Sequence, residues 1–462
     1  MKKVNENSCH MCMPMGGIFS FKGVEKSMVI LHGSQGCATY MRRHIAEHFN
    51  EPVDVASSSL NEKGTIYGGE KNLKQGLDNV IKIYNPKFIG VLTTCLAETI
   101  GEDVDRIVSA YLKEKGLVHL SAAAVSTPGY GGSHSEGYLK ACHQIVAALA
   151  KKSPGHNKIN VIVPNISPAD IREIKRILNI MGVDFTLFPD YSNTLDQSFV
   201  KPYQKMPTGG TKISDIQSMS GAVATVQTVL TAGKQPTAGA YLEKEFGVPL
   251  YETPIPLGLE NTDIFLNTVK RITGKEIPRS LGEERGRLLD AMIDSHKYNF
   301  QGRSILFGDP ELVLAAVGVC LENGVFPVVV ASGSKNTRLQ QLLQPRFNQL
   351  NREACFLTGA DFVSIREKAV EYKANIAIGS SEGKYLTEKE GIPLVRFGFP
   401  IHDRVGGQRL LSVGYNGTAM FLDRITNTLL ENKLNNYRRK MYESFYRGEN
   451  KELIGAELRW KE

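Results

Sequence analysis

The chain has 462 residues, too many for one ordinary hydrophobic core, so two to three domains are expected. With 42% hydrophobic and 22% charged residues, it has the composition of a soluble globular protein. Its net charge of +7 is spread along the sequence without a clustered basic patch, and no apolar run approaches membrane-spanning length, so neither nucleic-acid binding nor membrane insertion is expected. The start of the chain lacks an apolar signal core, so we expect a cytoplasmic protein.

Strand-like apolar runs alternate with amphipathic stretches almost from end to end. The expected elements, in chain order, are strands at 27–32, 53–57 and 88–92, with helices from about 37 to 49, from the Gly68-Gly69 turn to 84, and from about 102. The pattern restarts with a strand at 158–163, a helix with Ser167 as N-cap and Pro168 in its first position, and a strand at 183–188. It restarts again with strands at 304–307, 326–330, 354–357, 375–378 and 394–397, a helix at 310–322, and closing helices from about 414.

This alternation, with short connections, predicts parallel sheets covered by helices on both faces. The fold is therefore predicted as α/β, with three doubly wound, Rossmann-like parallel-sheet domains and C-terminal helices. Plausible boundaries at 151–158 and in the charged stretch 278–286 divide the chain into domains of residues 1–155, 156–285 and 286–462.

Three cysteines in the first predicted domain are candidate metal ligands. Cys12, Cys37 and Cys95 are each expected in a loop, and two of them follow predicted strands, at the sheet edge where α/β proteins bind ligands. A single cysteine is more often a small buried hydrophobic residue, but three in the loops of one domain favour an iron–sulfur cluster.

Residues next to these cysteines suit such a cluster. Cys37 opens a helix, whose N-terminus favours the thiolate, and Gly36 would let backbone amides approach sulfide. The hydroxyl of Thr94, next to Cys95, is a candidate hydrogen-bond donor.

Other metal-binding patterns are weaker. Cys9 and Cys12 form a C-x-x-C pair, but a zinc site requires a second pair. His44 and His48 have helical spacing, yet their charged neighbours indicate a solvated face. The remaining cysteines fall in predicted helix or strand interiors and are expected in the core: Cys142, Cys320 and Cys355.

Nucleotide-binding and hydrolase motifs are missing from the sequence. The glycine-rich segment 129–134 lacks the order of a dinucleotide site, and neither a P-loop nor a G-x-S-x-G elbow occurs. A cluster-bearing protein without a nucleotide site needs another protein to supply its electrons.

Several segments resemble the β-type subunits of nitrogenase component 1, and the resemblance spans nearly the whole chain. The segments are HGSQGC (32–37), EPVDVASSS (51–59), IYGG (66–69), TTCLAETIGED (93–103), TPGYGGSH (127–134) and GFPIHDR (398–404). The resemblance implies three α/β domains and a homologous α-type partner in an α2β2 heterotetramer. It also implies an ATP-dependent iron protein as electron donor.

The same resemblance implies a cluster shared with the partner, either [4Fe–4S] or a larger P-cluster-like centre. Its ligands from this side would be Cys12, Cys37 and Cys95, and a contribution from Cys9 is left open. Catalytic β subunits of the family carry a serine, which can ligate the oxidised cluster, at the position of Gly129. Glycine cannot provide that ligand.

The branch within the family follows from such departures. Four features favour the cofactor-scaffold type, NifN. They are Gly129, the eleven residues before Cys12 in place of a long extension, and the segments CATYMRR (37–43) and DRVGGQR (403–409). That type pairs with a NifE-like subunit and matures the iron–molybdenum cofactor. The alternative is a catalytic β subunit with a NifD-like partner, or a nitrogenase-like reductase, because some scaffold chains keep only the cysteine matched by Cys37.

Two other interpretations concern the cysteines and the acidic residues that follow Cys95. A metal-free structural subunit would hold its cysteines as core thiols. The acidic residues after Cys95 (Glu98, Glu102 and Asp103) are expected to complement a helix N-terminus, with contact to the docking iron protein as the alternative.

Overall fold

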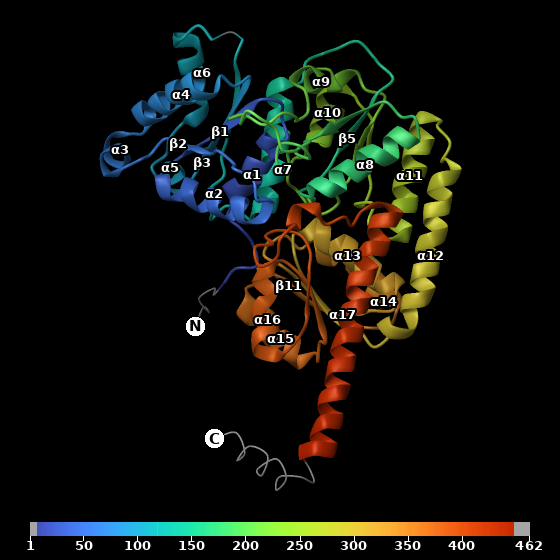
Figure 1. The fold of residues 1–462 in the computed structure, drawn as a ribbon. Helices are drawn as coiled ribbons and strands as arrows, with labels where there is room; N and C mark the ends of the chain where they lie inside the picture. The colour runs from blue at the N-terminus through green and yellow to red at the C-terminus, as the bar shows by residue number, and fades with distance from the viewer. Residues whose placement is uncertain (1–6, 118, 448–462) are drawn as a thin grey trace.

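The computed structural model describes residues 7–117 and 119–447 and contains three separate parallel sheets (Figure 1). The first has the order β2-β1-β3-β4, from β1 (Ser27–His32), β2 (Ala56–Ser57), β3 (Phe88–Thr93) and β4 (Ser121–Val125). The second has the order β6-β5-β7-β8, from β5 (Ile159–Ile162), β6 (Phe185–Phe188), β7 (Thr225–Gln227) and β8 (Leu250–Glu252). The third has the order β11-β10-β9-β12-β13, from β9 (Arg303–Gly308), β10 (Phe326–Ser332), β11 (Cys355–Thr358), β12 (Ile376–Gly379) and β13 (Leu394–Arg396). The predicted α/β fold is confirmed.

Helices connect and cover these strands. Those around the first sheet are α1 (Met13–Lys22), α2 (Gln35–Phe49), α3 (Glu62–Tyr67), α4 (Glu70–Tyr84), α5 (Cys95–Thr99), α6 (Val104–Glu114) and α7 (His134–Leu149). Those around the second are α8 (Pro168–Ile180), α9 (Ile213–Gln217), α10 (Ala238–Phe246) and α11 (Leu259–Thr273). The third part has α12 (Arg279–Asn299), α13 (Pro310–Glu322), α14 (Arg338–Gln349), α15 (Phe362–Glu371), α16 (Lys384–Glu390) and α17 (Gly414–Tyr442).

The first sheet explains where ligands can bind. Strands β1 and β3 are buried along their whole length, as apolar runs in a parallel sheet require, and they pair in register from Ser27↔Phe88 to His32↔Thr93. Because β2 and β3 lie on opposite sides of β1, the chain order reverses between β1 and β3. The loops that leave β1 and β3 therefore emerge side by side at a topological switch point.

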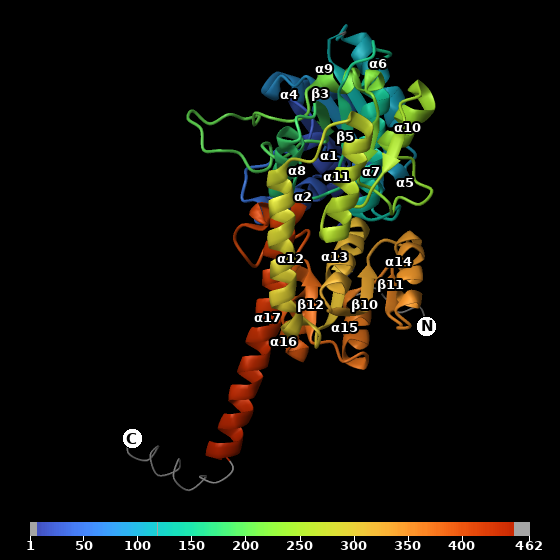
Figure 2. The ribbon, with the colours of Figure 1, turned by 90° about the vertical axis from the view of Figure 1, so that its right-hand side faces the viewer.

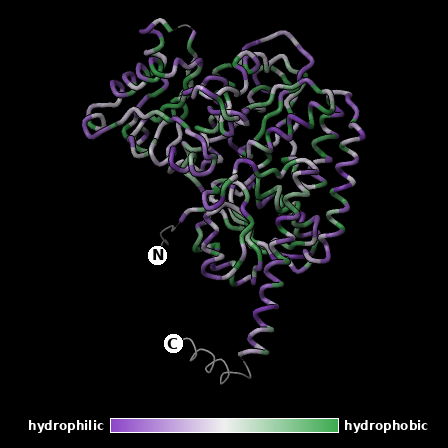
Figure 3. The backbone as a smooth tube through the Cα atoms, viewed as in Figure 1, coloured by the Kyte–Doolittle hydropathy of each residue, from purple (hydrophilic) through white to green (hydrophobic). Residues whose placement is uncertain are grey.

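Helix α1 is buried along its length and lies where the three parts meet (Figure 1). Its Phe19 ring packs edge-on against Phe49 at 5.6 Å and against Phe399 at 5.0 Å, between ring centroids. Phe49 ends α2, whereas Phe399 follows β13, so this aromatic cluster joins the first part to the third. Apolar segments gather on the inside of the molecule and polar ones on its surface (Figure 3).

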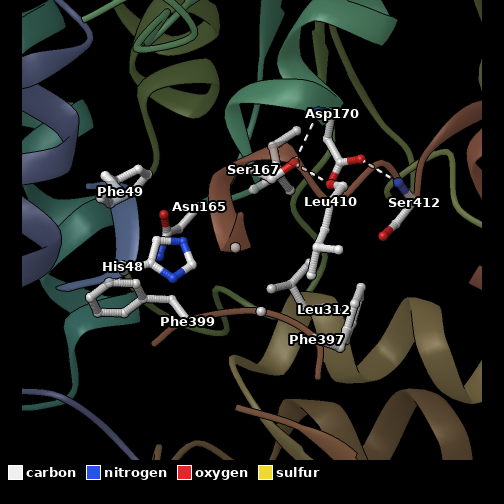
Figure 4. Close-up of a pocket in the computed structure, with 13 residues that line it drawn as sticks. His48, Phe49, Asn165, Ser167, Asp170, Leu312, Phe397, Phe399, Leu410 and Ser412 are labelled. Carbon is white, nitrogen blue, oxygen red and sulfur yellow. Dashed lines mark hydrogen bonds between the residues drawn. The ribbon is translucent and has the colours of Figure 1, made fainter. Parts of the chain in front are cut away.

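A small cavity of about 30 Å³ lies at this junction, with room for one or two water molecules (Figure 4). Here Asp170 of α8 accepts hydrogen bonds from the backbone N–H groups of Ser412 (2.7 Å) and Val413 (3.1 Å), and burial raises the pKa of Asp170 to about 6. The Ser167 hydroxyl donates to the carbonyl of Leu410 at 2.8 Å. These bonds fasten the second part to the segment before α17.

His48 lines the same cavity, so the predicted solvated face is wrong for this residue. Its Nδ1 accepts a hydrogen bond from the backbone N–H of Ile401 at 2.9 Å. Burial lowers the pKa of His48 to about 3, which keeps the ring neutral. Ala38, Met41 and Ile45 precede it on the buried side of α2, and their helical spacing extends to residue 48.

The third part is braced by two long helices. The charged stretch 278–286, expected at a domain boundary, forms the start of α12, where Glu284 accepts from Arg176 of α8. Helix α17 runs alongside α12 and then projects beyond the body (Figure 2). Among the described residues, no helix is both long and apolar enough to span a lipid bilayer.

Candidate functional site

All three candidate cysteines lie at helix N-termini. Cys12 precedes its helix and lies in a loop as predicted, whereas Cys37 and Cys95 lie within the first turn of theirs. Cys12 is the N-cap of α1, Cys37 lies in the first turn of α2, and Cys95 is the first residue of α5. Free backbone N–H groups give a helix N-terminus a partial positive charge, which favours a thiolate over a thiol. The helix-terminus position expected for Cys37 is thus shared by the other two cysteines.

Cys12 and Cys95 meet at Gly129, which follows β4. The Gly129 N–H donates to Cys95 Sγ at 3.1 Å. A Cβ built on Gly129 would lie 2.7 Å from Cys12 Sγ and 3.3 Å from Cys95 Sγ, so the two sulfur atoms flank the glycine. Cys12 reaches this place because its backbone bridges to Ser133, just before α7.

Cys37 belongs to the same group of thiols. Burial, followed by the charges of Cys95 and Cys37, raises the pKa of the Cys12 thiol to about 11. Cys37 Sγ also accepts a hydrogen bond from the hydroxyl of Ser34, the N-cap of α2, at 3.6 Å. Sequence reasoning missed Ser34, although a serine just before a helix start is a recognisable N-cap signal.

The cysteines of the chain differ in how exposed they are. Cys12 and Cys37 are half-buried and Cys95 is exposed, whereas Cys142 and Cys320 are buried as predicted. Cys355 differs from prediction, because it lies half-buried on the edge strand β11. Core packing therefore does not account for the placement of Cys95, whereas Cys12 and Cys37 are partly packed against the main core.

Cys9 lies apart from this group. Its N–H donates to the carbonyl of Ala360 at 2.9 Å, and its carbonyl packs against Gly333, both in the third part. Burial raises the pKa of Cys9 to about 12. Its backbone ties the start of the chain to the third sheet.

Gly36 and Thr94 differ in what surrounds them. Gly36 is exposed in the first turn of α2, and an added Cβ would meet only Ser34 Oγ, at 3.8 Å. The Thr94 hydroxyl is buried and donates to the carbonyl of His32 at 3.2 Å. Thr94 therefore braces the start of α5 against β1, in place of the predicted hydrogen bond toward a cluster.

The donor set does not fit a single metal ion. Within residues 7–117 and 119–447, no three His, Cys, Asp or Glu side chains come close enough together to ligate one ion. An iron–sulfur cluster needs a different ligand geometry, because each thiolate binds a separate iron atom and the cysteine sulfur atoms do not converge on one ion. Three cysteine thiols near one sheet edge, with a glycine that leaves room between two of them, fit part of such a cluster's ligand set.

Comparison with known proteins agrees with this arrangement. Residues 12–430 match the family model "Nitrogenase component 1 type Oxidoreductase". The nitrogenase molybdenum-iron protein beta chain of Methanococcus maripaludis is 35% identical over 437 residues, covering 91% of this chain and 93% of that relative. The nitrogenase vanadium-iron protein beta chain of Trichormus variabilis is 34% identical, covering 92% and 93%.

A solved structure agrees as well. "Nitrogenase Cp1 at pH 6.5" superposes with a TM-score of 0.89 at 34% identity, covering 93% of this chain and 94% of the solved one. Cysteine placement, fold and sequence similarity together show that the chain belongs to the nitrogenase component 1 family, as a β-type member.

Proposed function

We propose that this chain supplies Cys12, Cys37 and Cys95 as thiolate ligands to an iron–sulfur cluster shared with a homologous α-type subunit. The observation that carries the proposal is the position of Gly129 between the sulfur atoms of Cys12 and Cys95. When bound, the cluster would supply one-electron chemistry. The residues of this chain would hold its thiolates at helix N-termini and donate hydrogen bonds to sulfur from Gly129 and Ser34.

The partners follow from the same proposal. Half-exposed ligands at the edge of one chain need a second surface to exclude water, and a homologous α-type subunit in an α2β2 heterotetramer provides it. An ATP-dependent iron protein would deliver the electrons, and a cofactor in the α-type subunit would receive them.

Purification of the co-expressed pair under anaerobic conditions tests this function. Wild-type complex should be coloured and contain iron, and Cys37→Ala should lose a large part of that iron while the two chains still co-purify. The matched control is Cys142→Ala, which removes a buried thiol elsewhere and should keep its iron. Iron-free wild type, or full iron in Cys37→Ala, would contradict the proposal.

The scaffold role in maturation of the iron–molybdenum cofactor is our first candidate within this function. Gly129 supports it, because glycine has no side-chain oxygen with which to ligate an oxidised cluster from this position. A scaffold complex should transfer its matured cofactor to a cofactor-free nitrogenase and should not itself reduce dinitrogen.

A catalytic β subunit is the second candidate. Its support comes from the relatives, which are named as nitrogenase beta chains and are covered over 93% of their length. The same preparation separates the two roles, because a catalytic complex should reduce dinitrogen or a related substrate when given iron protein and ATP.

A further inference from the structure

Glu102, between α5 and α6, turns inward. Its side chain is only 8% exposed. One carboxylate oxygen, Oε1, accepts from the backbone N–H of Gly69 at 2.5 Å, and Oε2 lies 3.6 Å from Nε2 of His32. The neighbouring Asp103 is exposed and caps α6 by accepting from the Arg106 N–H, and Glu98 lies in the first turn of α5, so the expected helix-terminus role holds for these two residues but not for Glu102.

His32 is where the two cysteine-bearing segments meet. It is fully buried as the last residue of β1, the strand that leads to Cys37. Thr94 immediately precedes Cys95. The His32 carbonyl accepts hydrogen bonds from the Thr94 N–H, at 3.1 Å, and from the Thr94 hydroxyl. A displacement of His32 would therefore move the starts of both segments.

The His32 ring is held on both sides. Its Nδ1 lies 2.9 Å from the hydroxyl of Ser58, which also accepts from the N–H of Gly33 at 3.1 Å. Ser58 thus holds the Nδ1 side of the ring, and the Nε2 side faces Glu102. One carboxylate oxygen of Glu102 therefore accepts from the Gly69 N–H, and the other lies against the His32 ring.

Gly69 brings a third segment, between α3 and α4, onto this ring. A Cβ at Gly69 would lie 2.9 Å from His32 Cε1 and 2.6 Å from Leu60 Cδ2, so only glycine allows the close approach. The resulting clamp consists of Glu102, His32, Ser58 and Gly69.

We infer that Glu102 is a positioning residue for the cluster, fixing the Cys37 and Cys95 segments relative to each other and setting one buried negative charge behind them. This inference rests on the proposed function. A fixed negative charge near a cluster favours the more oxidised state of that cluster, and therefore lowers its midpoint reduction potential. Loss of the charge should raise that potential even where the ligands are intact.

Glu102→Gln tests this inference in the anaerobically purified complex with the α-type partner. The amide keeps the shape of the side chain and the acceptor for Gly69 but removes the charge. In a redox titration followed by EPR, we expect a midpoint potential more positive than wild type, with wild-type iron content. Asp103→Asn is the matched control, because it removes the same charge at the next, exposed position and keeps a good helix cap; its potential should match wild type.

Glu102→Asp separates charge from packing. It keeps the charge but cannot reach Gly69, so we expect a near-wild-type potential with a lower melting temperature. A Glu102→Gln complex that titrates like wild type, or equal shifts in Glu102→Gln and Glu102→Asp, would overturn the inference. An iron-free wild-type complex would instead refute the proposed function.

Discussion

Gly129→Ala should disrupt the cysteine group directly. The new Cβ would lie 2.7 Å from Cys12 Sγ, whereas non-bonded atoms of this size rest at about 3.5–4.0 Å. The Cys12 sulfur must therefore move by about 1 Å, which is several times the roughly 0.2 Å tolerance of metal–ligand distances. Overpacking of this kind costs about 1–3 kcal/mol, so the fold should survive while the ligand geometry does not.

Iron content per complex, together with the melting temperature, measures this effect. We expect Gly129→Ala to co-purify with its partner, to melt a few degrees lower, and to lose iron. Gly155→Ala is the matched control, because its Cβ would meet no heavy atom within 4 Å. Wild-type iron and an unchanged EPR spectrum in Gly129→Ala would refute the placement of the cluster at this glycine.

Three further outcomes are expected. Cys9→Ala should keep full iron, measured by metal analysis, because Cys9 is held against the third sheet; iron loss would show that it is a ligand. Ser167→Ala removes the cap bond to the Asp170 N–H (3.0 Å) and should cost about 1 kcal/mol in denaturant unfolding; an unchanged midpoint would contradict this. Burial raises the pKa of the Glu311 carboxyl from 4.5 to about 7, so the folded protein holds this proton more tightly than the unfolded chain does. The difference contributes about 3 kcal/mol to the free energy of unfolding. That contribution is full below pH 4.5 and is lost as the pH rises through 7. Glu311→Gln should flatten that pH dependence in thermal melts, and equal slopes for both proteins would contradict the assignment.

Strands and capped helices were the most predictable parts of this fold. The first strand, 27–32, was predicted to the residue because a continuous apolar run is bounded by polar residues. Ser167 and Pro168 begin α8 as predicted, since both residue types act locally. The edge strand β2 was overpredicted, because only Ala56 and Ser57 pair with β1 although Val53 and Val55 are buried.

Errors arose where tertiary contacts decide the outcome. Five-residue helix α5 has no strong local signal, so the sequence predicts a loop at Cys95. The charged neighbours of His48 indicate an exposed side chain, but its burial depends on packing against residues far along the chain. The sequence neighbours of Glu102 likewise predict a role at a helix N-terminus, whereas its partners, His32 and Gly69, lie 70 and 33 positions away.

For the candidate site, the residue types were predictable but their mutual arrangement was not. Cys12, Cys37 and Cys95 could be singled out from their glycine-rich surroundings and from the switch-point rule. The arrangement of the sulfur atoms depends on how β4 and α7 lie against α1. This packing decides which sulfur atoms share a neighbour and which N–H groups point at them.

Iron-edge anomalous diffraction from crystals of the complex, grown without oxygen, is the most direct test of the central claim. The account predicts iron peaks within bonding distance of the sulfur atoms of Cys12, Cys37 and Cys95, at the boundary with the α-type subunit. Strong iron peaks elsewhere in the complex, with none beside these three sulfur atoms, would contradict it.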